Sequence, residues 1–120
     1  MHLDLLKRWL YGVCSQDINK VLSLYTADAV LLGTFAATIK QGQGLQAYFR
    51  KFLGRADLCG QIDTCIMQET KGSLILSGLY TFQWLDTGGP VKQQARYSFV
   101  FVPVGQDWLI LNHHSSAVPK

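Results

Sequence analysis

The spacing of apolar residues in the first half of the chain predicts three helices and one short strand. Residues three or four positions apart share one face of a helix. We expect Ser15 to cap the second helix and Gly54 to end the third. Residues 29–32 predict a short apolar strand between the second and third helices. The three helical series are Leu3, Leu6, Leu10 and Val13; Ile18, Val21, Leu22 and Tyr25; and Leu45, Tyr48, Phe49, Phe52 and Leu53.

From residue 61 onwards the pattern changes to strands. Alternating apolar residues predict strands at roughly 61–69, 73–85, 91–104 and 108–116, and Asp86 to Gly89 provides a hairpin turn. The fold class is therefore α+β, with three N-terminal helices packed on a curved, mostly antiparallel sheet that forms a cone. We find no linker or repeat, so residues 1–120 are expected to form a single domain.

Both faces of the predicted sheet are largely apolar. Helices on one side can cover only one of these faces, and a sheet face in water should alternate more cleanly between apolar and polar residues. We therefore expect a homodimer or larger homo-oligomer that packs through the sheet. On the strand from residue 91, one face has Ala95, Tyr97, Phe99 and Phe101, and the other has Arg96, Ser98, Val100 and Val102.

The last strand, residues 108–116, changes abruptly from apolar to polar at Asn112. Because side chains alternate along a strand, His113 and Ser115 are expected on one face with Leu109 and Leu111. His114 and Ser116 are expected on the other face. The change has two interpretations: a polar group at the end of an apolar cavity, or a strand that frays into solvent.

Composition narrows the class of protein. Hydrophobic residues make up 48% of the chain and charged residues 16%, which indicates a globular domain. The net charge is +3, but the basic residues are scattered, so we expect no nucleic-acid partner. No apolar stretch is long enough for a membrane span. The cysteines, Cys14, Cys59 and Cys65, lack metal-site spacing and are interpreted as reduced thiols of a cytoplasmic protein.

Several familiar chemistries lack the residues that they require. Adjacent histidines on a strand point to opposite faces, so His113 and His114 are poorly placed to share a metal ion, and we expect no metal site. Most carboxylates fall at turns, which leaves Asp63 as a weak candidate for a buried base. No phosphate-binding loop is present, and Ser115 and Ser116 do not lie on the sharp turn that a hydrolase nucleophile occupies.

A neutral hydrogen-bonding set remains. It consists of His113 and Ser115, with Thr34 after the short strand and Tyr48 on the third helix. Each residue also has a structural explanation: Thr34 can close a turn, and Tyr48 can be a core aromatic. In a cone, however, the short strand, the third helix and the last strand converge on one cavity mouth.

The chain resembles a known group of proteins over nearly its whole length. The series that it shares are Asp28 to Thr34, Tyr48 to Leu53, Ser77 to Phe82, Ala95 to Phe101 and Trp108 to Pro119. Together they resemble bacterial proteins similar to the association domain of calcium/calmodulin-dependent protein kinase II, within the nuclear-transport-factor-2-like superfamily. The His-His-Ser-Ser ending at residues 113–116 resembles the iota-class carbonic anhydrases.

This resemblance implies an enzyme that reversibly hydrates carbon dioxide to bicarbonate, as a homodimer with one cone-shaped pocket per subunit. The catalytic residues that it implies are Thr34, Tyr48, His113 and Ser115. Members of the class are described both with and without metal. The absence of a metal-ligand pattern favours the metal-free kind, so no cofactor is expected. The chain shows no leader sequence, which favours the cytoplasm.

In the mechanism that we expect, Thr34, Tyr48 and Ser115 orient a water molecule by hydrogen bonds, and His113 biases the water proton outward while it remains mostly neutral. Carbon dioxide is expected to bind against the apolar residues Phe35, Phe52 and Leu111. Two alternatives remain open from the sequence. One is a non-catalytic oligomerisation domain, and the other is a binder or isomerase of a small molecule with Asp63 in its pocket.

Overall fold

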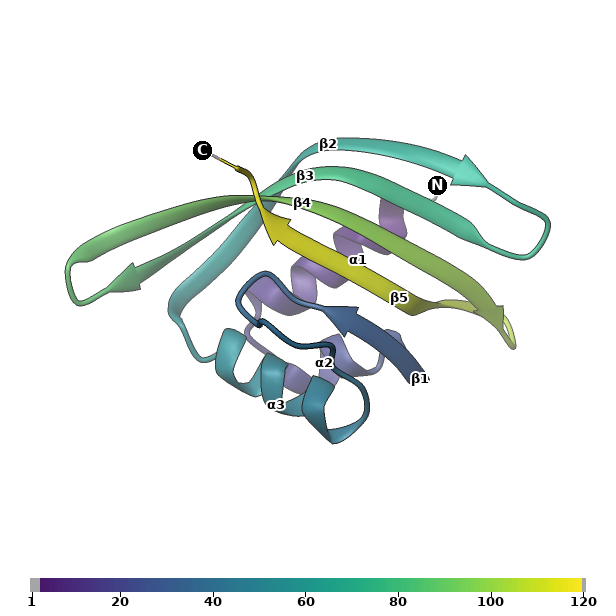
Figure 1. Cartoon of the computed structure of the whole chain (residues 1–120), viewed down its shortest axis with the longest axis horizontal. Coiled ribbons are helices and arrows are strands. Elements are labelled where there is room, and N and C mark those ends of the chain that lie inside the picture. The colour runs from purple at the N-terminus through teal and green to yellow at the C-terminus, as the bar shows by residue number, and fades with distance from the viewer. Residues whose placement is uncertain (1–2, 120) are drawn as a thin grey trace.

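The computed structural model of the chain describes residues 3–119. Its elements follow in the order α1 (Leu3–Cys14), α2 (Ile18–Leu22), β1 (Tyr25–Leu32), α3 (Gln43–Phe52), β2 (Ala56–Glu69), β3 (Leu74–Asp86), β4 (Gly89–Val104) and β5 (Asp107–Ala117). The strands form one sheet in the order β1-β5-β4-β3-β2, in which only the β1–β5 pair is parallel. The sheet arches over the helices (Figure 1). The predicted α+β cone is confirmed.

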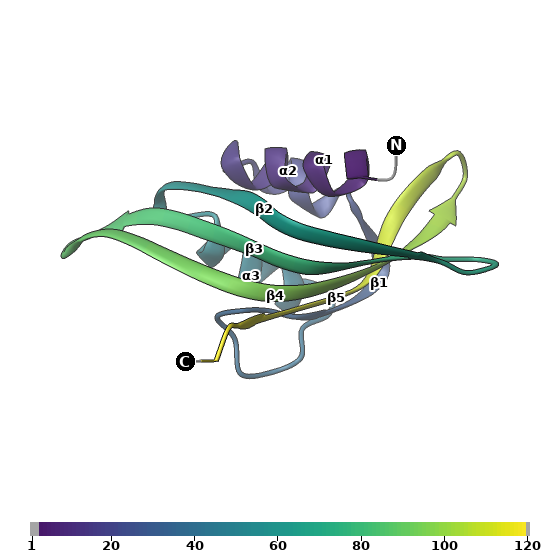
Figure 2. The ribbon, with the colours of Figure 1, turned by 90° about the horizontal axis from the view of Figure 1, so that it is seen from above.

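The helices cover one face of the sheet (Figure 2). Trp9 of α1 stacks on Tyr80 of β3, with ring centroids 5.7 Å apart, and makes an edge contact with Phe99 of β4 at 5.2 Å. Phe52 of α3 packs against Phe82 of β3 at 5.1 Å. These aromatic contacts join helices and sheet into one core.

The boundary between α2 and β1 differs from the prediction. The sequence pattern assigns Tyr25 to the second helix, but α2 ends at Leu22 and Tyr25 is the first residue of β1, paired with Ile110. The cap of α2 is Asp17, whose carboxylate accepts from the backbone of Asn19 and Lys20, instead of the expected Ser15. Only two residues, Ser23 and Leu24, lie between helix and strand, which leaves too little polar sequence to signal this boundary.

The prediction that all the cysteines are reduced thiols is wrong for two of them. Cys14 at the end of α1 and Cys59 of β2 form a disulfide, and Cys65 is free. Their separation of 45 residues along the chain gave no spacing signal. Because disulfides are uncommon in the cytosol, the cysteines no longer support a cytoplasmic location, which remains a prediction. No helix between residues 3 and 119 is long and apolar enough to cross a membrane.

Candidate functional site

The polar end of β5 faces the interior of the cone. His113 is 2% exposed and Ser115 is 4% exposed, and these are the buried polar residues of the described chain. His114 is exposed and Ser116 is half-buried on the opposite face. The predicted division of the four residues between the two faces is confirmed. The alternative that this strand frays into solvent is wrong.

A β-bulge changes which apolar residues accompany this polar pair. Pairing of β5 with β4 shifts between Phe101–Ile110 and Val100–Asn112, so Leu111 is the extra residue. Ile110 is fully buried, and Leu111 is only half-buried. Strict alternation placed Leu109 and Leu111 on the face of His113, but Leu109 pairs with Val102 on the outer face and Leu111 is the bulged residue. The proposed role of Leu111 in binding carbon dioxide has no support from its position. Leu31 of β1 borders the cavity instead.

His113 lies in a chain of buried hydrogen bonds that spans the cone. The indole N–H of Trp9 donates to the hydroxyl of Tyr25 at 3.0 Å. The Tyr25 hydroxyl is 2.8 Å from Nδ1 of His113, and the Tyr80 hydroxyl is 3.1 Å from Nε2. The ring of His113 also stacks on Phe99, with centroids 3.8 Å apart.

The donors in this chain determine the tautomer of His113. An indole N–H can only donate, so the Tyr25 oxygen accepts from Trp9 and directs its own proton to Nδ1 of His113. A neutral imidazole that accepts at Nδ1 has its proton on Nε2, and this N–H donates to the Tyr80 oxygen. The proton of Tyr80 is then directed onwards, and its hydrogen-bonding neighbours are Ser115 and Thr34.

Burial keeps the side chains of His113, Tyr80 and Tyr25 uncharged. Loss of solvation, with a smaller contribution from the nearby His114, lowers the pKa of His113 to about 3. Burial raises the pKa of Tyr80 and of Tyr25 far above the ordinary value for a phenol. His113 is therefore neutral near pH 7, as predicted, and both its nitrogens are occupied by tyrosines. It is suited to position Tyr80 and poorly suited to accept a proton from water.

Thr34 and Tyr48 complete the site from the other side. The Thr34 hydroxyl makes a short hydrogen bond with the Ser115 hydroxyl. The backbone N–H of Phe35 donates to the Tyr48 hydroxyl at 3.4 Å, and burial raises the pKa of Tyr48. Gly33 permits this approach, because a Cβ atom at that position would collide with the Tyr48 ring. The structure thus brings all four predicted catalytic residues together.

These residues enclose a small inner cavity. The space open to the centre of a water molecule is about 10 Å³, close to what one water requires. Its lining combines the four predicted residues with the aromatic side chains of Trp9, Phe49, Phe52, Tyr80 and Phe82, and with Leu31 and Gly33. No Asp, Glu, Lys or Arg belongs to this lining. The inner cavity is therefore an uncharged site with several hydrogen-bonding groups.

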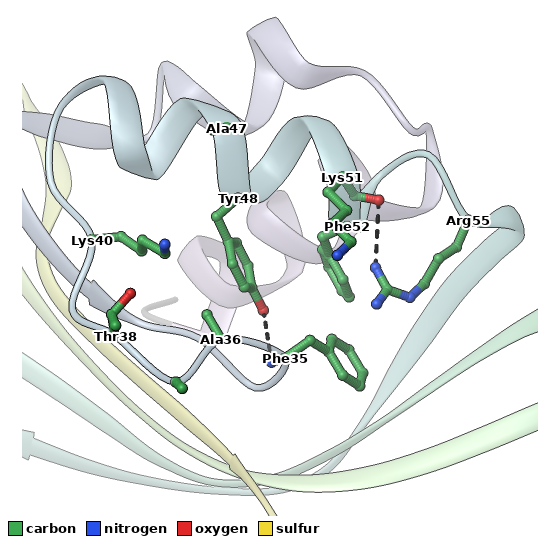
Figure 3. Close-up of a pocket in the computed structure, with 10 residues that line it drawn as sticks. Phe35, Ala36, Thr38, Lys40, Ala47, Tyr48, Lys51, Phe52 and Arg55 are labelled. Atoms are coloured by element: carbon green, nitrogen blue, oxygen red, sulfur yellow. Dashed lines mark hydrogen bonds between the residues drawn. The ribbon is translucent and has the colours of Figure 1, made fainter.

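A second, open hollow shares Tyr48 and Phe52 with the inner cavity (Figure 3). This surface hollow has a volume of about 350 Å³. It lies between the segment that follows β1 and helix α3, and its lining is Phe35, Ala36, Ala37, Thr38, Lys40, Ala47, Tyr48, Lys51, Phe52 and Arg55. Phe35, predicted as a wall of the carbon dioxide site, borders only the surface hollow, whereas Phe52 borders both spaces.

Two other sequence-based candidates are placed away from the inner cavity. Asp63 is exposed on the outer face, where its carboxylate accepts from Thr81 at 2.6 Å, Gln61 at 3.0 Å and Gln94 at 3.1 Å. The slight burial of Asp63 raises its pKa, but the three hydrogen bonds outweigh this effect and lower the pKa below its ordinary value. Asp63 is thus no buried base, which removes the feature that favoured an isomerase. Among residues 3–119, no group of three His, Cys, Asp or Glu side chains could hold a metal ion.

Sequence reasoning missed the three aromatic residues that hold His113. The sequence pattern gives Trp9 and Tyr80 no role in the site, and it places Tyr25 on a helix. A usable signal existed for Tyr80, since a tyrosine predicted on the inward face of a central strand needs a buried partner for its hydroxyl. For Trp9, no sequence feature indicates that its N–H meets a residue sixteen positions away.

Comparisons with known proteins agree with this architecture. A family model for the calcium/calmodulin dependent protein kinase II association domain matches residues 3–119. A crystal structure from Xanthomonas campestris, assigned provisionally to the same domain, shares 34% identity over 97% of this chain and 84% of its own, with a TM-score of 0.89. A search of curated protein sequences found no match.

More distant structures share the fold. The CaMKII hub of S. rosetta is 19% identical over 97% of this chain and 93% of its own, with a TM-score of 0.79. A nuclear transport factor 2-like protein from Salmonella enterica is 16% identical over 98% and 88%, with a TM-score of 0.85. At these identities the likeness concerns the fold alone.

Proposed function

This chain belongs to the calcium/calmodulin-dependent protein kinase II association domain family, and we propose that its inner cavity hydrates carbon dioxide reversibly. The observation that supports this proposal is the convergence of Thr34, Tyr48, His113 and Ser115 on one enclosed, uncharged space. Negative charge that develops on a substrate oxygen in the transition state is stabilised by hydrogen-bond donors that are already in place.

In the proposed reaction, the Thr34–Ser115 pair holds a water molecule in the inner cavity. Because the inner cavity has room for about one water, carbon dioxide approaches this water from the side of Tyr48 and Phe52, which line both the cavity and the surface hollow. The water oxygen bonds to the carbon, and one C=O electron pair moves onto its oxygen. The water proton leaves through the Thr34 and Ser115 hydroxyls to solvent, which leaves bicarbonate.

Tyr80 is the group that we expect to stabilise the new oxyanion. His113 donates to the Tyr80 oxygen, so the Tyr80 proton is available to Ser115, Thr34 or a substrate oxygen. His113 thus acts as a positioning residue for Tyr80. This differs from the role in which His113 itself biases the water proton.

Stopped-flow hydration of carbon dioxide by chelator-treated protein tests the proposal. We expect activity above buffer, and Ser115→Ala should lower kcat/KM by about 100-fold, because it removes one donor from the site. Ser116→Ala on the opposite face is the matched control and should retain full activity. Buffer-level activity of the unmodified chain, or full activity of Ser115→Ala, would refute the proposal.

A second candidate function is self-association, which a different observation favours. The sheet face away from the helices holds partly exposed apolar side chains on three neighbouring strands: Ile75, Leu79, Val100, Val102 and Leu109. Two similar structures are described as a CaMKII hub and a CaMKII hub homology domain. We propose that copies of this chain pair through this face.

Light scattering coupled to size exclusion tests this assembly. Leu79→Asp places a charge on this face and should convert the oligomer to monomers. Lys71→Asp, in the exposed turn between β2 and β3, should leave the mass unchanged. A monomeric unmodified chain at high micromolar concentration, or an unaltered Leu79→Asp oligomer, would contradict this candidate.

A further inference from the structure

The surface hollow combines positive charge with an absence of negative charge. Lys40, Lys51 and Arg55 all contribute to its lining, and no Asp or Glu does. Figure 3 shows Lys40 on the segment that follows β1 and Lys51 on α3, with Arg55 beyond the end of that helix. Three cations from separate segments around one concave surface repel one another unless an anion lies between them.

Arg55 is held in place before any ligand binds. Its guanidinium lies 4.3 Å from the ring centroid of Phe35, 5.4 Å from that of Phe52 and 5.3 Å from that of Trp84. One nitrogen, Nη1, donates to the backbone oxygen of Lys51 at 3.4 Å. Stacking on the rings fixes the plane of the guanidinium. Because a guanidinium has five N–H donors, other donors remain for a ligand. A fixed side chain loses less entropy when it binds.

The remainder of the lining suits an apolar group. The small side chains of Ala36, Ala37 and Ala47 and the rings of Phe35 and Tyr48 border the hollow (Figure 3). Its volume of about 350 Å³ falls within the range of small-molecule sites and exceeds the size of bicarbonate. The ligand therefore has an anionic group for the three cations and an apolar body for the rest.

We propose that the surface hollow binds a small organic carboxylate, whose anionic group pairs with Arg55 and Lys51 or Lys40 and whose apolar body lies on the aromatic and alanine side chains. Arginine matches a carboxylate through two parallel hydrogen bonds, which favours this anion over a spherical one. The site does not depend on catalysis in the inner cavity. A bound molecule would, however, lie directly over Tyr48 and Phe52, which the two spaces share.

Titration of the 120-residue chain with benzoate, followed by ¹⁵N-resolved NMR, tests the proposal. Benzamide, which has the same ring without the charge, is the matched ligand control. We expect saturable shifts of the amides at residues 35–40 and of the Arg55 side chain. Benzamide should bind about tenfold more weakly or not at all, because it lacks the charge-assisted hydrogen bonds.

Two variants locate the binding, and a third serves as control. Arg55→Gln should weaken benzoate binding by about tenfold or more. Lys51→Gln, at an exposed position where misfolding is not expected, should weaken it about threefold, and Lys71→Gln changes the net charge equally but should have no effect. Equal binding of benzamide, or unchanged binding by both Arg55→Gln and Lys51→Gln, would overturn the proposal.

The same titration on Ser115→Ala separates this site from the reaction in the inner cavity. Benzoate should bind that variant as it binds the unmodified chain, whether or not either protein hydrates carbon dioxide. Absence of saturable binding at high millimolar benzoate would overturn the carboxylate site and leave the hydration proposal standing.

Discussion

The two faces of β5 present the same pair of residue types in opposite surroundings. His113 and Ser115 are almost fully buried among aromatic rings, whereas His114 and Ser116, one position along, lie on the outer face. Tyr25 and Tyr80 hydrogen-bond to the two ring nitrogens of His113, and Trp9 donates in turn to Tyr25. Burial and hydrogen-bond partners, and not residue type alone, therefore determine what a histidine on this strand can do. The outer pair thereby provides matched controls for the inner pair.

The largest expected difference between the faces is in stability. His113→Ala leaves the Tyr25 and Tyr80 hydroxyls without their common partner and creates a cavity in the core. We expect it to lower the free energy of unfolding by about 4 kcal/mol, since each unsatisfied buried group costs about 1–3 kcal/mol. His114→Ala should cost under about 0.5 kcal/mol. Urea denaturation at fixed protein concentration measures both, and equal losses would contradict the comparison.

The next prediction concerns the position along β5 at which the bulge changes which side chains point inward. The bulge at Leu111 makes Ile110 the buried residue and leaves Leu111 half-exposed. Ile110→Ala should cost about 3 kcal/mol and Leu111→Ala about 1 kcal/mol or less. Strict alternation from His113 predicts the reverse order. Urea denaturation of the two variants therefore decides between a bulged and a regular strand.

This bulge illustrates how far sequence alone could define the site. Periodicity identified the three helices, the four long strands and the division of β4 into two faces, because burial of one face leaves a repeating pattern. It also separated His113 from His114. A bulge adds one residue without a distinctive sequence, so the pattern could not reveal that Leu111 leaves the inner face.

Long-range partners were also beyond the sequence. The bond from Trp9 to Tyr25, the disulfide between Cys14 and Cys59, and the contact of Tyr80 with His113 join residues between 16 and 45 positions apart. Local propensity has no information at such separations. The resemblance to a known family supplied Thr34, Tyr48, His113 and Ser115, and the structure then supplied the aromatic residues that orient them.

A third prediction uses acid to distinguish the two histidines. The pKa of His113 is about 3 in the folded protein and about 6.5 when unfolded, so the unfolded state takes up protons first. The stability that this group contributes is fully present above about pH 6.5 and decreases as pH falls towards 3. Between pH 7 and pH 5 the loss is about 2 kcal/mol.

His113→Gln removes this titration, so its free energy of unfolding should depend less on pH over that interval. His114→Gln is the control and should keep most of the dependence, although it also removes the smaller of the two influences that lower the pKa of His113. Urea denaturation at several pH values measures each slope. Identical slopes for His113→Gln and the unmodified chain would show that His113 is not buried in its neutral form.

The smallest expected effect concerns the residue that orients the inner histidine from a distance. Trp9→Phe keeps a ring against Tyr80 and Phe99 but removes the N–H that donates to Tyr25. Tyr25 is then free to turn its proton away from Nδ1 of His113, so the second tautomer of the imidazole gains population. We expect a stability loss of about 1 kcal/mol from the missing hydrogen bond, plus any loss from the smaller ring.

The ¹⁵N chemical shifts of the two ring nitrogens of His113 are the sharper measurement, because a change in packing alone does not move the proton from one nitrogen to the other. A His113 that remains fully protonated at Nε2 in Trp9→Phe would show that Tyr80 and Phe99 fix its tautomer without Trp9. A mixed tautomer there, with His114 unchanged, would show that the properties of the inner face of β5 depend on a hydrogen bond that begins on α1.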